Sequence, residues 1–113
     1  MKNDLPVVLI VEDEDSIRLL LRNYLVQKDF TVFVASEGVG ALKIMLDNEI
    51  DVIITDYKME ILGGDYWIKF LNRYCADKKI IITSGFLEPN FKISFPILYK
   101  PYQLDELSKL ILT

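Results

Sequence analysis

Histidine is absent from this 113-residue sequence, and cysteine occurs once, as Cys75. Without histidine the chain cannot form the Ser–His or Cys–His pairs of nucleophilic catalysis, a zinc site of the usual kind or a phosphohistidine of its own. A single cysteine also excludes an internal disulfide. We interpret Cys75 as a small apolar residue near the end of a helix.

The sequence also lacks a basic excess and any long hydrophobic run. Lys and Arg number 13 against 17 Asp and Glu, which gives a net charge of -4 and argues against direct nucleic-acid binding. The early apolar stretch, residues 6–11, ends in Glu-Asp-Glu-Asp, so it is neither a signal-peptide core nor a membrane span. We therefore expect a cytoplasmic protein without membrane contact, folded as one domain over residues 1–113.

Phosphate-binding glycine loops are missing as well. No G-x-x-x-x-G-K-[ST] motif occurs, and Gly38-Val39-Gly40 lacks a third glycine and follows the second predicted strand rather than the first. Nucleotide-binding loops are therefore unsupported, and because the chain has no histidine of its own, any phosphoryl group must be supplied by another molecule.

The sequence does contain a regular alternation of apolar segments and amphipathic stretches. The predicted strands are Val7–Val11, Thr31–Ala35, Val52–Thr55, Lys79–Thr83 and Pro96–Tyr99. Four helices are predicted from stripes of inward residues: Ile17, Leu20, Leu21, Tyr24 and Leu25; Val39, Leu42, Met45 and Leu46; Trp67, Phe70, Leu71 and Tyr74; and Leu104, Leu107, Leu110 and Ile111. Ser36 is the predicted N-cap of the second helix. Continuously apolar strands with short connections predict an α/β fold with a doubly wound, five-stranded parallel sheet.

Charged residues stand where the apolar strands end. Glu12 and Asp13 follow the first strand, Asp56 follows the third, and Lys100 follows the fifth. The carboxyl ends of parallel strands share one edge of the sheet, where open α/β folds bind ligands. Converging carboxylates repel one another unless a cation joins them, which favours a hard divalent ion such as Mg2+. The lysine indicates that an anion, a phosphoryl group above all, also comes to this edge.

Four motifs, each at a strand end and in order along the chain, resemble one known family. They are Val-Leu-Ile-Val-Glu12-Asp13-Glu14, Ile-Ile-Thr-Asp56-Tyr-Lys-Met59, Ile-Ile-Thr-Ser84-Gly85 and Leu-Tyr-Lys100-Pro101-Tyr102. Together they are similar to the receiver domains of response regulators in two-component signalling, including the chemotaxis regulators. The resemblance implies the flavodoxin-like strand order 2-1-3-4-5 and a regulatory domain rather than an enzyme.

The resemblance also implies a role for each site residue. Asp56 would accept a phosphoryl group from a phosphohistidine on a histidine kinase or a histidine phosphotransfer protein. Mg2+ would be held by Asp13, Glu12, Asp56 and the backbone carbonyl of Lys58. Lys100 would pair with Asp56 at rest and with a phosphoryl oxygen afterwards, and Ser84, rather than Thr83, would donate its hydroxyl to another phosphoryl oxygen. A cis peptide bond is expected between Lys100 and Pro101.

The sequence departs from the family pattern in three places. Glu60 stands where proline commonly follows D-x-x-M, and Ile97 stands where an aromatic switch residue is usual. Lys100 follows Ser84 by only 16 positions, 100 minus 84, and the segment 85–97 has no helical stripe. We therefore expect a short or missing fourth helix, and weak or no homodimerisation through the surface that this helix helps to form.

Two alternative functions remain open on the sequence. The chain could be a receiver-like interaction module that is not phosphorylated, although the complete set of site residues argues against this. It could also be a small-molecule binder or a phosphatase with a nucleophilic aspartate. The second alternative lacks a phosphate-binding glycine loop, and Lys58 stands where a second aspartate would be expected.

Overall fold

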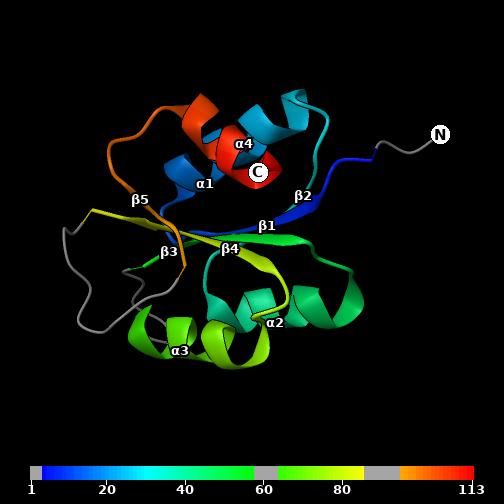
Figure 1. Cartoon of the computed structure of the whole chain (residues 1–113), viewed down its shortest axis with the longest axis vertical. Coiled ribbons are helices and arrows are strands. Elements are labelled where there is room, and N and C mark those ends of the chain that lie inside the picture. Colours follow the sequence, from blue (N-terminus) through cyan, green and yellow to red (C-terminus); the bar gives the residue numbers. More distant parts are fainter. Residues whose placement is uncertain (1–3, 58–63, 86–94) are drawn as a thin grey trace.

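The computed structural model describes residues 4–57, 64–85 and 95–113. Strands and helices alternate along the described part of residues 4–85, and residues 95–113 add one strand and one helix (Figure 1). They are β1 (Val7–Val11), α1 (Asp15–Gln27), β2 (Thr31–Ala35), α2 (Gly38–Asp47), β3 (Val52–Asp56), α3 (Gly64–Tyr74), β4 (Lys79–Ser84), β5 (Ile97–Tyr99) and α4 (Leu104–Leu112). The five strands form a parallel sheet in the order β2-β1-β3-β4-β5, which confirms the predicted fold class and strand order. The predicted short or missing fourth helix falls largely on residues 86–94, outside the described residues.

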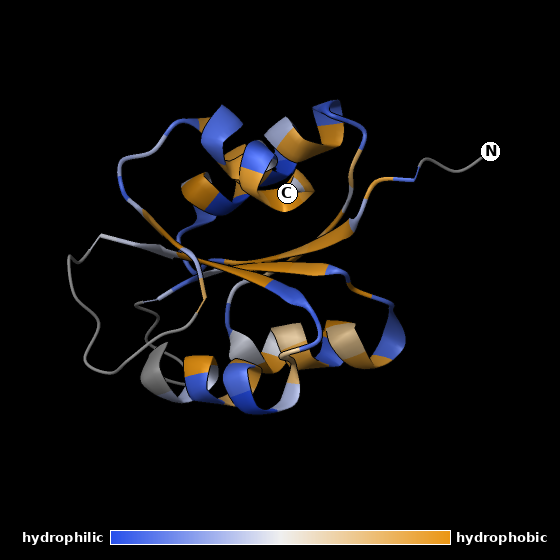
Figure 2. Ribbon diagram, in the orientation of Figure 1, coloured by the Kyte–Doolittle hydropathy of each residue, from blue (hydrophilic) through white to orange (hydrophobic). Residues whose placement is uncertain are grey.

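Helices cover both faces of the sheet. Figure 1 shows α1 and α4 on one face and α2 and α3 on the other. Two hydrophobic cores result, one that joins Leu9 and Ile53 to the α2–α3 layer and one that joins Ile10 and Ile54 to the α1–α4 layer. Because neighbouring side chains of a strand point to opposite faces, a strand that supplies both cores must be apolar throughout. This is the reason for the uninterrupted apolar strands (Figure 2). Among the described residues, no helix has the length and apolarity that a membrane span requires.

The strand register brings the carboxyl ends of β1, β3 and β4 side by side. Val11 of β1 is level with Thr55 of β3, and Asp56 is level with Thr83 of β4. Every residue of β3 is buried, including Asp56. The central strand therefore ends in a carboxylate that its neighbours shield from water.

Several helix faces differ from the sequence prediction. Leu20, Val39, Leu46 and Tyr74, predicted to point inward, are exposed, Leu46 by 85%. In α1 the buried residues are Leu21 and Leu25, and Leu20 lies at the margin of that stripe. In α2 the buried residues are the small Gly38 and Ala41, which leaves Val39 and Leu46 on a solvent-facing flank.

The second helix begins one residue later than predicted. Glu37, rather than Ser36, is its N-cap, and the Glu37 side chain accepts a hydrogen bond of 2.8 Å from the Gly40 N–H. A carboxylate at this position satisfies a free backbone donor and also interacts favourably with the helix dipole.

Trp67 connects α3 to the end of β3. The indole is fully buried, and its Nε1–H donates to the Thr55 hydroxyl oxygen at 2.8 Å. The Thr55 hydroxyl in turn lies 3.3 Å from the backbone oxygen of Asp56. Phe70 stacks on Trp67 with ring centroids 5.9 Å apart, so the predicted core role of this aromatic stripe is confirmed for both residues. Cys75 is buried directly after the last residue of α3, as predicted.

We predict that Trp67→Phe lowers the free energy of unfolding by about 2 kcal/mol, because it removes the hydrogen bond to Thr55 and part of a buried ring. Urea unfolding followed by far-UV circular dichroism measures the change. Tyr66→Phe on the same helix is the matched control, since Tyr66 is 72% exposed and its replacement should be neutral. Equal stability of the two variants would contradict the role of the buried indole.

Candidate functional site

Three carboxylates converge at the carboxyl edge of the sheet. Glu12 and Asp13 follow β1, Asp56 ends β3, and one oxygen from each lies within 4.8 Å of the others. Glu12 is 2% exposed and Asp56 is 6% exposed, whereas Asp13 faces solvent. The convergence predicted from the strand ends is therefore present.

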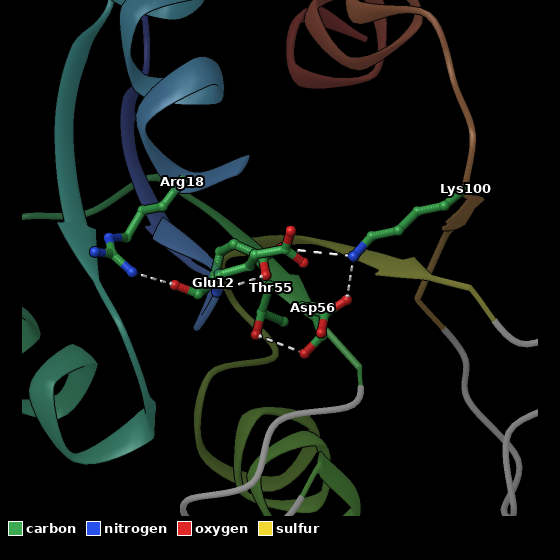
Figure 3. A network of polar contacts seen from close by, with 6 residues as sticks. Glu12, Arg18, Thr55, Asp56 and Lys100 are labelled. Atoms are coloured by element: carbon green, nitrogen blue, oxygen red, sulfur yellow. Dashed lines mark hydrogen bonds and ion pairs between the residues drawn. The ribbon is translucent and has the colours of Figure 1, made fainter. Parts of the chain in front are cut away.

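Lys100 reaches the same point from the end of β5 (Figure 3). Its Nζ lies 2.8 Å from Asp56 Oδ1 and 3.6 Å from Glu12 Oε1. The backbone fixes the approach, since the Lys100 N–H donates to the Ser84 carbonyl at 2.7 Å. The peptide bond between Lys100 and Pro101 is cis, as predicted.

Ser84 and Thr83 lie beside Asp56 at the end of β4. Both are buried, and the Tyr57 N–H donates to the Thr83 carbonyl at 2.8 Å, next to the acidic cluster. The choice of Ser84 as the hydroxyl donor stays a prediction. Lys58, whose carbonyl is a predicted metal ligand, and Glu60 lie outside the described residues.

The site holds more negative charge than its lysine neutralises. Burial raises the pKa of Glu12, and the charge of Asp56 raises it further. Burial also raises the pKa of Asp56, and the hydrogen bond and charge of Lys100 only partly oppose this. Burial alone would lower the pKa of Lys100, but its hydrogen bond with Asp56 and the charges of Asp56 and Glu12 raise it. Two shielded carboxylates and an exposed third, all within reach of one ion, fit a hard divalent cation with oxygen ligands.

Three contacts of the site were not predicted from the sequence. Arg18 Nη1 donates to the backbone oxygen of Glu12 at 2.9 Å, and the Glu14 N–H donates to Glu12 Oε2 at 3.1 Å. The third is the hydrogen bond from Trp67 to Thr55. The sequence signal for Arg18 is its spacing, because a residue five positions after Asp13 falls in the first turn of the following helix.

An apolar groove of about 290 Å³ adjoins the site. Ile17, Leu20 and Leu21 of α1 line one side. The chain from Lys100 to Leu104 lines the other side and includes Pro101 and Tyr102. Burial raises the pKa of the Tyr102 phenol.

A parallel sheet in this order, with three carboxylates and a lysine at its carboxyl edge, defines a receiver-type signalling domain. Residues 8–112 match the response regulator receiver domain family, and the chain belongs to that family. Over 109 residues it is 35% identical to the sensor kinase CckA of Brucella abortus, an alignment that covers 89% of this chain and 12% of the kinase. It is 26% identical over 110 residues to the regulatory protein AtoC of Escherichia coli, covering 92% of this chain and 24% of AtoC. The chain thus spans a small part of the curated relatives that it matches.

Solved receiver structures agree with the fold. The receiver domain of the Francisella response regulator 1452 superposes with a TM-score of 0.83 at 27% identity, covering 95% of this chain and 93% of that one. The receiver domain of the hybrid histidine kinase CckA gives a TM-score of 0.78 at 27% identity, with 93% and 94% covered. The acidic pocket of this chain therefore fits the phosphoacceptor site of a receiver domain.

We predict that Asp56→Asn raises the melting temperature of the Mg2+-free protein at pH 7. A carboxyl group whose pKa rises on folding adds stability that is present below its unfolded pKa, about 4, and lost as the pH rises through the folded value. At neutral pH the ionised Asp56 is therefore destabilising, and each 1 kcal/mol relieved corresponds to roughly 4–8 °C in a domain of this size.

Differential scanning calorimetry from pH 7 to about pH 4 measures this effect, and the difference should shrink as Asp56 in the wild type takes up a proton. Glu49→Gln, at an exposed acid outside the cluster, is the control and should leave the melting temperature unchanged. A lower melting temperature for Asp56→Asn at pH 7 would show that the Lys100 ion pair outweighs the burial of the charge.

Proposed function

We propose that this domain takes a phosphoryl group from a partner's phosphohistidine onto Asp56, in the cytoplasm and with Mg2+, and changes conformation in response. One observation supports this above the others. Asp56 is a buried carboxylate that shares a cluster with Glu12 and Asp13 and holds Lys100 at 2.8 Å. The complete set of charged groups gives no support to a receiver-like module that is never phosphorylated.

The proposed step is a displacement at phosphorus. A carboxylate oxygen of Asp56 forms a bond to phosphorus while the bond from phosphorus to the partner's imidazole nitrogen breaks, and the bonding pair remains on that nitrogen. Lys100, already hydrogen-bonded to Asp56, keeps the carboxylate more ionised than burial alone would allow and can then pair with a phosphoryl oxygen. The Ser84 hydroxyl would donate to a further phosphoryl oxygen and draw the end of β4 toward the site.

The acidic residues would hold the metal. Glu12, Asp13 and Asp56 supply carboxylate oxygens close enough to share one ion, and the Lys58 carbonyl stays a predicted ligand. When bound, Mg2+ neutralises charge on the carboxylates and on the transferring phosphoryl group. Burial raises the pKa of Glu12 and the charge of Asp56 raises it further, so a bound cation would stabilise both ionised carboxylates.

The apolar groove beside the site suits the partner, which we propose to be a histidine kinase or a histidine phosphotransfer protein. Leu19 and Leu20 of α1 are more than half exposed, and Leu20 also lines the groove next to Lys100. A helix bearing the phosphohistidine could bury these side chains while it presents its imidazole to Asp56. We propose that this contact, rather than a homodimer, is the principal interaction of the domain.

We predict that acetyl phosphate labels the chain only when Mg2+ is present, and that Asp56→Asn abolishes labelling without loss of fold. Asp13→Ala should raise the Mg2+ concentration needed for half-maximal labelling, because one metal ligand is lost. Glu49→Gln should label like the wild type. Intact-mass and peptide mass spectrometry measure the extent and position of labelling. Phosphate on another residue, or full labelling in excess chelator, would overturn the proposal.

We also predict that Leu20→Arg slows phosphotransfer from a phosphohistidine partner by about tenfold, the effect of losing roughly 1.4 kcal/mol of docking energy. Labelling by acetyl phosphate requires no docking and should change much less. Leu46→Arg is the matched control, since Leu46 is 85% exposed on α2, on the other face of the sheet. Equal slowing by both substitutions would contradict docking at the groove.

A further inference from the structure

We propose that Arg18 is a positioning residue for the metal site, which holds the peptide between Glu12 and Asp13 so that the Asp13 carboxylate meets the other two. The inference rests on the proposed function, because it concerns the same Mg2+ site. A positively charged side chain, Arg18, would thus support the binding of a metal cation, Mg2+.

The Arg18 side chain connects the first turn of α1 to the end of β1 (Figure 3). It is 21% exposed, and its Nη1 donates to the Glu12 backbone oxygen at 2.9 Å. Its Nη2 forms an ion pair with Asp15, one turn earlier in the helix. A planar guanidinium held at two nitrogens has little freedom to turn, so the carbonyl that it binds is fixed as well.

The other groups of Glu12 are held without Arg18. Its N–H donates to the Ala35 carbonyl at 3.0 Å, its Oε2 accepts from the Glu14 N–H at 3.1 Å, and its Oε1 lies 3.6 Å from Lys100 Nζ. The Glu12 carbonyl is the group that receives a side-chain donor from α1. This contact therefore determines the orientation of the peptide that leads into Asp13.

Asp13 depends on that peptide more than its neighbours do. It is exposed, and its carboxylate forms no hydrogen bond or ion pair with the residues that the structure describes. Glu12 and Asp56 are both fixed by Lys100, but Asp13 has only the backbone to place it. If the peptide turns, Asp13 leaves the cluster while Glu12 and Asp56 stay.

Arg18 can affect Mg2+ affinity through its charge or through its hydrogen bond to Glu12, and these two effects predict opposite changes when Arg18 is replaced. On charge alone, removing a cation close to a Mg2+ site should strengthen Mg2+ binding. On position, removing the hydrogen bond should weaken it, because the turn must be ordered when the metal binds. The sign of the change in affinity therefore separates the two effects.

The test is calorimetric titration of Mg2+ into the full chain and three variants. Arg18→Met keeps an apolar stem but no donor, and its Mg2+ dissociation constant should rise about tenfold, as for other outer partners of metal ligands. Arg18→Lys restores one donor and should recover part of the loss. Arg22→Met, one turn further along the exposed face of α1, removes the same charge without touching Glu12 and should not weaken binding. The unfolding midpoint of each Mg2+-free variant is measured alongside.

A dissociation constant for Arg18→Met equal to or below that of the wild type would overturn the inference, as would a lower unfolding midpoint with unchanged affinity. Equal weakening by methionine and lysine would overturn the hydrogen-bond explanation. If Arg18→Met does not fold, Arg18→Lys still tests the inference, because replacing the guanidinium by a single flexible donor should weaken Mg2+ binding several-fold. No Mg2+ uptake by the wild type would overturn the proposed function and this inference with it, whereas uptake with no effect of Arg18 overturns the inference alone.

Discussion

Two carboxylates buried beside one ammonium group are the constraint around which this domain is organised. Glu12 and Asp56 both lie next to Lys100, and their pKa values remain raised in spite of it. The attraction to a single lysine does not offset the loss of hydration of two charges. The cluster therefore suits a hard cation, and the proposed ligands of the site are Mg2+ and then a phosphoryl group.

The sheet creates this arrangement and prevents its relaxation. Since β1 and β3 are adjacent and parallel, the residues that follow them must meet at one edge. Helices cover both faces of the sheet (Figure 1), and Glu12 and Asp56 are both buried at its edge. The apolar strands thus contribute to the chemistry, because a looser sheet would let Glu12 and Asp56 move apart and solvate.

The strands and the central charges could be predicted from the sequence for the same physical reason. A parallel strand covered on both faces needs an unbroken apolar run, and the predicted ends of these strands lie within one residue of the observed ends. The helix faces were harder to predict. Leu20 and Leu46 fit a helical stripe as well as their buried neighbours do, and only the packing of each helix shows which side of a broad apolar arc is covered. The hydrogen bonds of Arg18 to Glu12 and of Trp67 to Thr55 were not predicted, because each is a single side-chain contact that depends on the folded geometry.

Trp67 is the chain's one tryptophan, and it is buried on the α2–α3 side of the sheet, two hydrogen bonds from the backbone of Asp56. The tryptophan emission of this protein therefore originates at a single place, in the core between the sheet and the α2–α3 layer. The apolar groove and α1 lie on the α1–α4 side of the sheet and contain no indole. A change in tryptophan emission on phosphorylation would consequently report a rearrangement on the α2–α3 side of the sheet. Docking of a partner at the apolar groove would by itself leave this emission nearly unaltered.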